Sequence, residues 1–142
     1  MCIRDSNYRA LNLNDLYDAT LNLVQEGDDT ALERERLAAS QGWYIRMEGA
    51  GEKILGSSAT FDHVIRFTSY LPGLRLEGAC RPDIGESYFW AVNLLDGTPV
   101  NYTDSDDLSD KESVRARRRS PIPGGGLAPP VQTIFVLSLI HI

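Results

Sequence analysis

The sequence predicts a mainly-β fold, and the observations behind this expectation lie between Gly42 and Gly97. Short runs rich in aromatic and β-branched residues are separated by Gly, Pro and Asp-Gly turns, which is typical of a meandering antiparallel sheet. Trp43, Ile45 and Met47 alternate with more polar residues, as in a half-buried strand. Four such strands make one blade of a β-propeller, about 40–50 residues long. We therefore predict a fragment of a β-propeller, about one blade plus flanking strands, with a helical insertion near the N-terminus.

The two ends of the chain resemble sequencing adapter rather than protein. Residues 1–6 and 137–142 can be back-translated into DNA strings that are reverse complements of each other. Both strings resemble the transposon mosaic end used in sequencing libraries. We exclude them from fold reasoning and expect the natural sequence, residues 7–136, to be an internal piece of a longer reading frame.

Composition excludes some classes of function. The formal net charge is −6, an acidic balance that argues against nucleic-acid binding. Cys80 is the only cysteine between the adapter ends, so residues 7–136 cannot close a disulfide among themselves. The apolar run 131–142 is too short to span a bilayer, and no signal peptide or transmembrane span is recognised.

Two helices are predicted in the helical insertion, residues 13–41. Side chains at helical spacing indicate the first helix, and Gly27 follows it as a stop signal. Its N-cap is expected at Asn12 or Asn14, because asparagine accepts a hydrogen bond from a free backbone N–H of the first turn. The periodic positions are Leu13, Leu16, Tyr17, Thr20 and Val24.

The second helix is expected to follow at once. Thr30 and Glu33 have the spacing of a capping box, and Gly42 is expected to end the helix. Its run of alternating Glu and Arg residues is more typical of a solvated face than of a binding site. The buried face would be formed by Leu32, Leu37, Ala38 and Ala39.

Blade strands are predicted within residues 43–102. The run 88–93 is aromatic and apolar on both faces, so we expect it to lie deep in a stack of sheets. A tight hairpin is expected at Asp96-Gly97, because glycine accepts positive φ without penalty. The run 64–70 alternates, and one of its faces is formed by Ile65, Phe67 and Ser69.

The character of the chain changes after these strands. Residues 103–130 are predicted to form a polar loop, because acidic residues, arginines and then a Gly- and Pro-rich run leave little that could be buried. Residues 131–136 predict one more strand.

The acidic part of this loop is the only sequence that resembles a cation site. Asp104, Asp106, Asp107 and Asp110 could supply oxygen ligands. An EF-hand-like loop also needs a glycine in its middle and a glutamate at its end, but the glycine is missing and Glu112 falls at the wrong place. We favour a solvated loop and predict no metal ligand.

No catalytic or cofactor-binding residue is expected either. His63 follows Asp62 at a predicted turn and has no second histidine nearby, so a turn role is favoured over metal binding. For Cys80, a structural or disulfide role is favoured over a nucleophile. Trp43 and Trp90 are expected at core positions. Ser57, Ser58 and Ser69 lie in no sequence context typical of a nucleophile. The basic run Arg117, Arg118 and Arg119 follows acidic residues that neutralise it, which argues against nucleic-acid binding.

Several motifs, taken in order, closely resemble the C-terminal β-propeller of the PilC/PilY type IV pilus biogenesis factors. The resemblance covers most of residues 12–135. It departs from the family at Arg66, where the family strand is usually apolar, and in the acidic loop. The motifs are Leu16-Tyr17-Asp18, Asn22-Leu23-Val24-Gln25, Gly42-Trp43-Tyr44-Ile45, Gly51-Glu52-Lys53-Ile54-Leu55, Phe67-Thr68-Ser69-Tyr70-Leu71-Pro72, the run from Cys80 to Gly97, and Gly124 to Val131.

The resemblance implies a large secreted protein at the tip of type IV pili, present at the cell surface or outer membrane and in the periplasm in transit. Members promote pilus assembly against retraction and act in adhesion. Their partners are pilins and minor pilins, together with host-cell or abiotic surfaces. The family's Asp-rich calcium loop has no match here, so we expect any calcium site outside this sequence and no cofactor within it.

Two other interpretations stay open. The Tyr88-to-Gly97 pattern also resembles the blades of quinoprotein dehydrogenases, which would make the chain part of an enzyme. Such an enzyme would need a calcium-bound carboxylate site and a tryptophan docking motif in every blade, and one blade-like unit lacks that set. The remaining interpretation is a propeller scaffold of another envelope complex.

Overall fold

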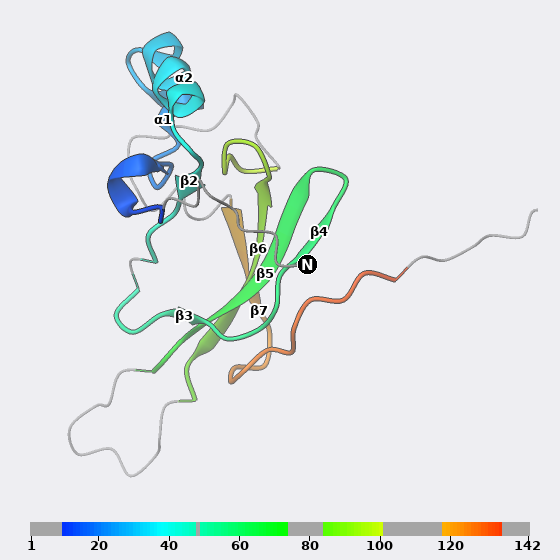
Figure 1. Cartoon of the computed structure of the whole chain (residues 1–142). Coiled ribbons are helices and arrows are strands. Elements are labelled where there is room, and N and C mark those ends of the chain that lie inside the picture. The colour runs from blue at the N-terminus through cyan, green and yellow to red at the C-terminus, as the bar shows by residue number, and fades with distance from the viewer. Residues whose placement is uncertain (1–9, 48, 74–83, 101–117, 135–142) are drawn as a thin grey trace, which may run out of the picture.

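The computed structural model describes residues 10–47, 49–73, 84–100 and 118–134. These residues are mainly sheet, as the sequence predicts, and include two short α-helices near the N-terminus (Figure 1). Both predicted adapter ends lie outside the described residues, as do Cys80 and the acidic run with its candidate cation ligands.

The larger sheet contains five strands: β3 (Lys53–Ile54), β4 (Ala59–Phe61), β5 (Val64–Leu71), β6 (Glu86–Asn93) and β7 (Arg119–Ile122). All neighbouring strands are antiparallel. β6 pairs with the whole length of β5, so β3 and β4 share the other edge of β5, one after the other. The sheet is therefore a meander, four positions wide, and among the described residues it does not close into a barrel (Figure 1).

Two tight turns form where the sequence predicts them. The β4–β5 hairpin turns at Asp62 and His63, whose φ angles of 50° and 59° are those of a type I′ turn. At the end of β6, Gly97 has a φ of 67°, and its N–H donates to the carbonyl of Asn93 at 2.9 Å. An added Cβ at Gly97 would meet the ring of Trp43 at 2.9 Å, so the glycine also permits close packing.

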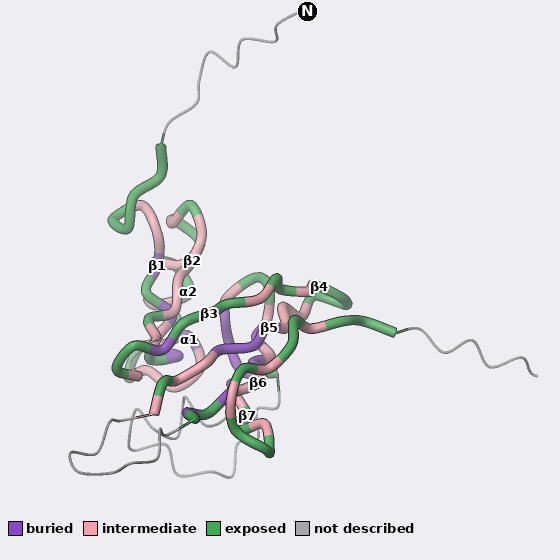
Figure 2. Tube along the Cα trace, turned by 90° about the horizontal axis from the view of Figure 1, so that it is seen from below, coloured by how far each residue is buried: buried purple, intermediate pink, exposed green. Residues whose placement is uncertain are grey.

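One face of the larger sheet, the closed face, is buried against the preceding chain. Phe67 and Trp90 lie opposite each other across β5 and β6 and are 8% and 2% exposed. Their rings stack with centroids 5.5 Å apart. Trp43, Ile45 and Met47 pack over them, which confirms the inward direction predicted from their alternation. Figure 2 shows buried residues concentrated here and in the N-terminal part of the chain.

The opposite face, the open face, is covered much less. Phe89 and Ala91 alternate with the buried residues of β6, so they point to this side, where both are only half-buried. Phe61, on β4, is 47% exposed on the same side. The prediction that this strand lies deep on both faces is therefore wrong for the described chain, because only one face of β6 has a layer packed over it.

Among the described residues, one segment crosses part of the open face. Residues 126–130, here called the strap, follow β7 and run back across the sheet (Figure 2). The hydroxyl of Ser87 donates to the carbonyl of Gly126 at 2.6 Å, and that of Thr68 donates to the carbonyl of Pro129 at 3.4 Å. Hydroxyl groups of β5 and β6 therefore hold the strap to the sheet.

The strap and β7 correct two predictions about the C-terminal part. The predicted polar loop 103–130 is wrong at residues 119–122, which pair with β6 as the edge strand of the larger sheet. The predicted strand 131–136 is absent from its described part, residues 131–134, which have no regular structure. Two consecutive prolines before it cannot donate to a strand ladder, and the strap crosses the sheet face instead of following an edge.

The N-terminal unit, residues 12–44, packs around its own small core of Tyr17, Ala19 and Val24, with Leu37 beside them. It contains a parallel two-stranded sheet formed by β1 and β2. Figure 1 shows its α-helices beyond one end of the larger sheet. The elements are a 3-10 helix (Leu13–Asp15), β1 (Tyr17–Asp18), α1 (Leu23–Glu26), α2 (Thr30–Ala39) and β2 (Trp43–Tyr44).

The predicted first helix is wrong in its middle. Its N-cap and stop are correct: Asn12 caps the 3-10 helix and Gly27 ends α1. Between them, however, the N–H groups of Tyr17 and Ala19 donate to the carbonyls of Gly42 and Tyr44 at 2.8 and 2.9 Å. Because these donors are used across β1 and β2, a continuous helix cannot form through this stretch.

The predicted second helix exists but differs at its ends and on its buried face. The cap is the side chain of Asp29, which accepts from the N–H of Leu32 at 3.0 Å, in place of the predicted capping box at Thr30. The helix ends at Ala39 rather than at Gly42. Of the predicted buried face only Leu37 is half-buried, because the helix lies at the outside of the unit; Leu32, Ala38 and Ala39 are exposed.

Candidate functional site

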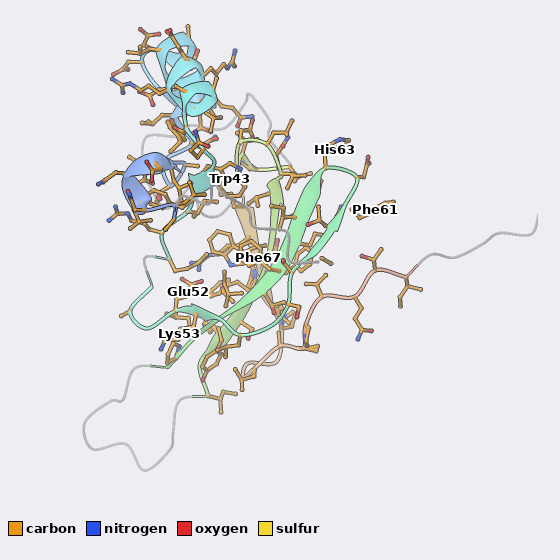
Figure 3. The ribbon with its side chains drawn as sticks, in the orientation of Figure 1. Trp43, Glu52, Lys53, Phe61, His63 and Phe67 are labelled. Atoms are coloured by element: carbon orange, nitrogen blue, oxygen red, sulfur yellow. The ribbon has the colours of Figure 1, made fainter. Side chains whose placement is uncertain are left out.

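A buried polar cluster occupies the closed face and is the most unusual chemical feature of the described chain. The side chains of Glu52 and Arg119 form an ion pair of 3.1 Å, and they are 0% and 9% exposed. Glu52 Oε1 also accepts from the hydroxyl of Ser69 at 2.6 Å, and that hydroxyl accepts from the indole N–H of Trp90 at 2.8 Å. Figure 3 shows Glu52 on the side of the sheet that carries Phe67 and faces Trp43.

The strand register places these groups together. Ser69 pairs with Ile54 across β5 and β3, which aligns Glu52, two residues earlier, with the closed face. Trp90 pairs with Arg119 across β6 and β7. The cluster thus joins β5, β6, β7 and the residue just before β3, so it forms only when β7 has completed the sheet.

The guanidinium of Arg119 also contacts aromatic rings. It lies 3.8 Å from the ring centroid of Tyr88 and 5.6 Å from that of Trp90. Both distances fall within the range of a cation–π interaction, which strengthens when the cation is desolvated. The hydroxyl of Tyr88 donates to the carboxylate of Glu86, and this hydrogen bond, with burial, raises the pKa of the tyrosine.

The cluster is costly to build and easily damaged. Glu52 Oε2 is buried and has no hydrogen-bond partner among the described residues. A buried ion pair often contributes no net stability, because removing both charges from water offsets their attraction. Removing one partner alone, however, strands the other charge at a cost of about 3–5 kcal/mol. We therefore interpret the cluster as a device that selects one packing arrangement.

A second arginine joins the N-terminal unit to the larger sheet. Arg118 is 2% exposed and donates to the carbonyls of Ala19 and Thr20 at 2.5 and 2.7 Å. Burial lowers the pKa of Arg118 to about 10, and the nearby carboxylate of Glu26 opposes this shift. The guanidinium therefore keeps its charge at neutral pH. Its planar fork suits two neighbouring carbonyl acceptors.

Tyr17 connects the two halves of the N-terminal unit. Its hydroxyl donates to Glu33 Oε2 on α2 at 2.8 Å. Burial and this hydrogen bond to a carboxylate raise the pKa of Tyr17 to about 12. The phenol form is thereby favoured in the folded protein.

A solvent-facing group lies on β1 and β2. Asp18 Oδ2 accepts from the hydroxyl of Tyr44 at 3.0 Å and lies 3.4 Å from Nε of Arg46. Burial tends to raise the pKa of Asp18, but hydrogen bonds from Thr20 and Tyr44, with the charge of Arg46, lower it overall. Every member of this group is paired, so we interpret it as a fastening between β1 and the chain after β2.

The structure separates the residues that the sequence singled out. His63 is exposed at the β4–β5 turn, where Figure 3 shows it at the tip of the hairpin, and Asp62 is the only acidic group described beside it, at 3.9 Å. Ser57 and Ser58 are exposed before β4. Of the predicted core tryptophans, Trp90 is buried, whereas Trp43 is half-buried and donates its indole N–H to the carbonyl of Leu94 at 3.0 Å.

The described residues offer little reactive chemistry. No group of three or more His, Cys, Asp or Glu side chains that could hold a metal ion occurs among them. Ser69 donates to a carboxylate, but it is 2% exposed and sealed beneath the packed closed face, so substrate cannot reach it. Within the same part of the chain, no helix is long and apolar enough to cross a membrane.

Sequence reasoning missed the three charged residues that matter most in the structure: Glu52, Arg118 and Arg119. The sequence pattern places both arginines in a basic run neutralised by acids, yet each is directed into the interior. A weak signal was present in each case. Glu52 precedes a strand at the position that shares a face with an apolar residue, and Arg119 begins a run that ends in Pro-Ile-Pro, which suits an edge strand.

Comparison with known proteins adds no assignment: no family model, no curated protein and no solved structure matches this chain.

Proposed function

We propose that this chain is part of the C-terminal β-propeller of a type IV pilus tip protein of the PilC/PilY kind, which promotes pilus assembly against retraction and mediates adhesion. The observation that carries the proposal is the order of motifs along residues 12–131, from Leu16-Tyr17-Asp18 to the Gly- and Pro-rich run. Ordered motifs over most of a chain are more specific than any one of them. The comparisons neither support nor oppose this assignment.

The geometry of the larger sheet supports the propeller part of the proposal. A blade is an antiparallel meander of four strands whose two faces pack against neighbouring blades. Here the chain that precedes the sheet covers the closed face through Trp43, Ile45 and Met47, and the chain that follows leaves across the open face through the strap. The chain thus enters on one face and leaves on the other, which is compatible with a neighbouring blade on each face.

The open face supports the same interpretation. Phe89, Ala91 and Phe61 leave apolar surface partly in water, which suits a face that a neighbouring blade would cover. The proposed role is non-enzymatic and belongs at the cell surface. The partners would be pilins and minor pilins, with a host-cell or abiotic surface as the adhesion target. A rigid disc of blades suits this role because its loops can change without disturbing the packed sheets.

The test is deletion of the full-length gene, in the parent strain and in a strain that lacks the retraction motor. Loss of surface pili in the first strain, with pili restored but adhesion still missing in the second, is the result expected of a protein that opposes retraction and also adheres. Re-expression of the intact gene is the control. Normal piliation and normal adhesion in both deletion strains would contradict the proposal.

The same strains distinguish the quinoprotein alternative. A dehydrogenase would leave piliation intact, and the deletion would instead remove a quinone-dependent, substrate-driven dye reduction from the cell envelope. The flanking sequence gives a second readout: a tryptophan docking motif repeated in every blade would favour the enzyme, and an Asp-rich calcium loop with an upstream adhesion domain would favour the pilus protein.

A further inference from the structure

β7 is held in the larger sheet by very little apolar contact. Ser120 and Pro121 are exposed, and Ile122 is only half-buried. The proline lacks an N–H, which weakens the ladder between β7 and β6 at the pair with Tyr88. A short edge strand with these features would fray if backbone pairing were all that held it.

Two adjacent arginines supply the missing anchorage, and they reach two different parts of the molecule. Arg119 extends onto the closed face, where it pairs with Glu52 at 3.1 Å and lies over Tyr88. Arg118, one residue earlier, extends into the N-terminal unit and binds the carbonyls of Ala19 and Thr20. Arg118 lies just before β7, where the backbone is still helical, and Arg119 is the first residue of the strand, so one short segment contacts both bodies.

We propose that Arg118 and Arg119 make β7 a latch, which couples the seating of the N-terminal unit to the completion of the larger sheet. With the latch closed, the Arg118 guanidinium holds the turn after β1 and the Arg119 guanidinium completes the buried polar cluster. With the latch open, the β6 edge loses its partner and the N-terminal unit loses a buried tie at the same time. The latch is a property of this fold and does not depend on the proposed function.

The remaining contact between the two bodies makes the coupling measurable. Trp43 and Ile45 pack against both the small core and the closed face, so the N-terminal unit stays attached by apolar contact when the latch opens. Opening is therefore a local event within a folded protein. Local opening is reported by the exchange of backbone N–H groups with solvent, region by region.

The decisive experiment perturbs one end of the latch and observes the other. Glu52→Gln keeps the size of the side chain but removes the charge that holds Arg119, and Glu52 has no described hydrogen bond or ion pair to the N-terminal unit. Hydrogen exchange measured by mass spectrometry on the full chain should show the N–H groups of Tyr17 and Ala19 exchanging about tenfold faster or more. In the reciprocal test, Arg118→Met should accelerate the exchange of backbone N–H groups in β6 and β7.

Three comparisons make the outcome definite. Arg36→Met removes an ion pair on α2 whose arginine side chain is 61% exposed, so it should leave exchange in β7 unchanged. The β4–β5 hairpin serves as an internal reference and should keep its protection in every variant. Arg118→Lys keeps the charge without the fork and should give a smaller acceleration than Arg118→Met, which covers the case in which the methionine variant does not fold.

Acceleration in Glu52→Gln that is confined to β6 and β7 would overturn the latch, because the two bodies would then be independent. Equal acceleration in the β4–β5 hairpin would overturn it as well, since the variant would have opened the whole sheet. Exchange in β7 that does not change in Arg118→Met or Arg118→Lys would show that Arg118 serves the N-terminal unit alone.

Discussion

The two faces of the larger sheet are made from the same strands but are held in different ways. On the closed face, aromatic rings stack over a sealed ion pair, and Phe67 is 8% exposed. On the open face, hydroxyl groups hold the strap, and Phe89 remains half-buried. The stability of the described chain therefore resides on one side of its sheet, whereas the other side is available to a further layer.

A matched pair of phenylalanines gives the largest expected effect. Phe67→Ala on β5 should lower the free energy of unfolding by about 3–5 kcal/mol, because it leaves a cavity beneath Trp90 that the neighbours cannot fill. Phe89→Ala, one strand away on the open face, should cost about 1 kcal/mol, because its ring is already partly in water. Urea unfolding followed by tryptophan fluorescence measures both. Equal losses would show that the two faces are equivalent.

Glu52 and Arg119 give the next effect. Glu52→Leu should destabilise the protein by about 3–5 kcal/mol, since it leaves a guanidinium buried without its partner. The double variant Glu52→Leu with Arg119→Met should recover most of that loss, because two apolar side chains of similar volume replace both charges. The double-mutant cycle is measured by the same denaturant titration. A double variant as unstable as the sum of its single variants would mean that the two residues act independently.

The strap gives a smaller effect on the other face. Ser87→Ala removes the hydroxyl that donates to the carbonyl of Gly126 at 2.6 Å and accepts from the N–H of Ala128 at 3.1 Å. We expect a loss of about 1–2 kcal/mol, the usual contribution of such hydrogen bonds. Faster proteolytic cleavage within residues 123–134 would accompany it. Ser57→Ala, at an exposed position before β4, is the matched control. If residues 123–134 were cleaved as fast in Ser57→Ala as in Ser87→Ala, the role of Ser87 would be contradicted.

Sequence patterns predicted the larger sheet better than they predicted what fastens it. Alternation placed Phe67 and Trp43 correctly, and turn chemistry placed Gly97, because both depend on neighbouring residues. The failures involve partners far along the chain. Helical spacing around Tyr17 gave way to a pairing with Gly42, and Arg118 is bound by carbonyls about a hundred residues earlier. Local spacing carries no information on such contacts.

The candidate site shows the same limit. Composition correctly describes the run around Arg118 and Arg119 as polar, and polar runs are mostly solvated. Whether a guanidinium is buried depends on an acceptor that another strand brings to it, here Glu52 for Arg119. The absence of reactive motifs in the sequence remains a prediction, because the acidic run and Cys80 lie outside the described residues.

The smallest expected effect is a change in the ionisation of Tyr17, which tests the N-terminal unit independently of both faces of the sheet. In the folded protein the pKa of Tyr17 is raised to about 12 by burial and by the hydrogen bond to Glu33. A raised pKa stabilises the fold fully below the pKa of the unfolded chain, about 10, and this contribution is lost as the pH rises toward about 12. Absorbance titration near the phenolate band should therefore show an ionisation step near pH 12 that is missing in Tyr17→Phe. A titration of Glu33→Gln should shift this step to lower pH, and a late step that persists in Tyr17→Phe would assign it to another tyrosine.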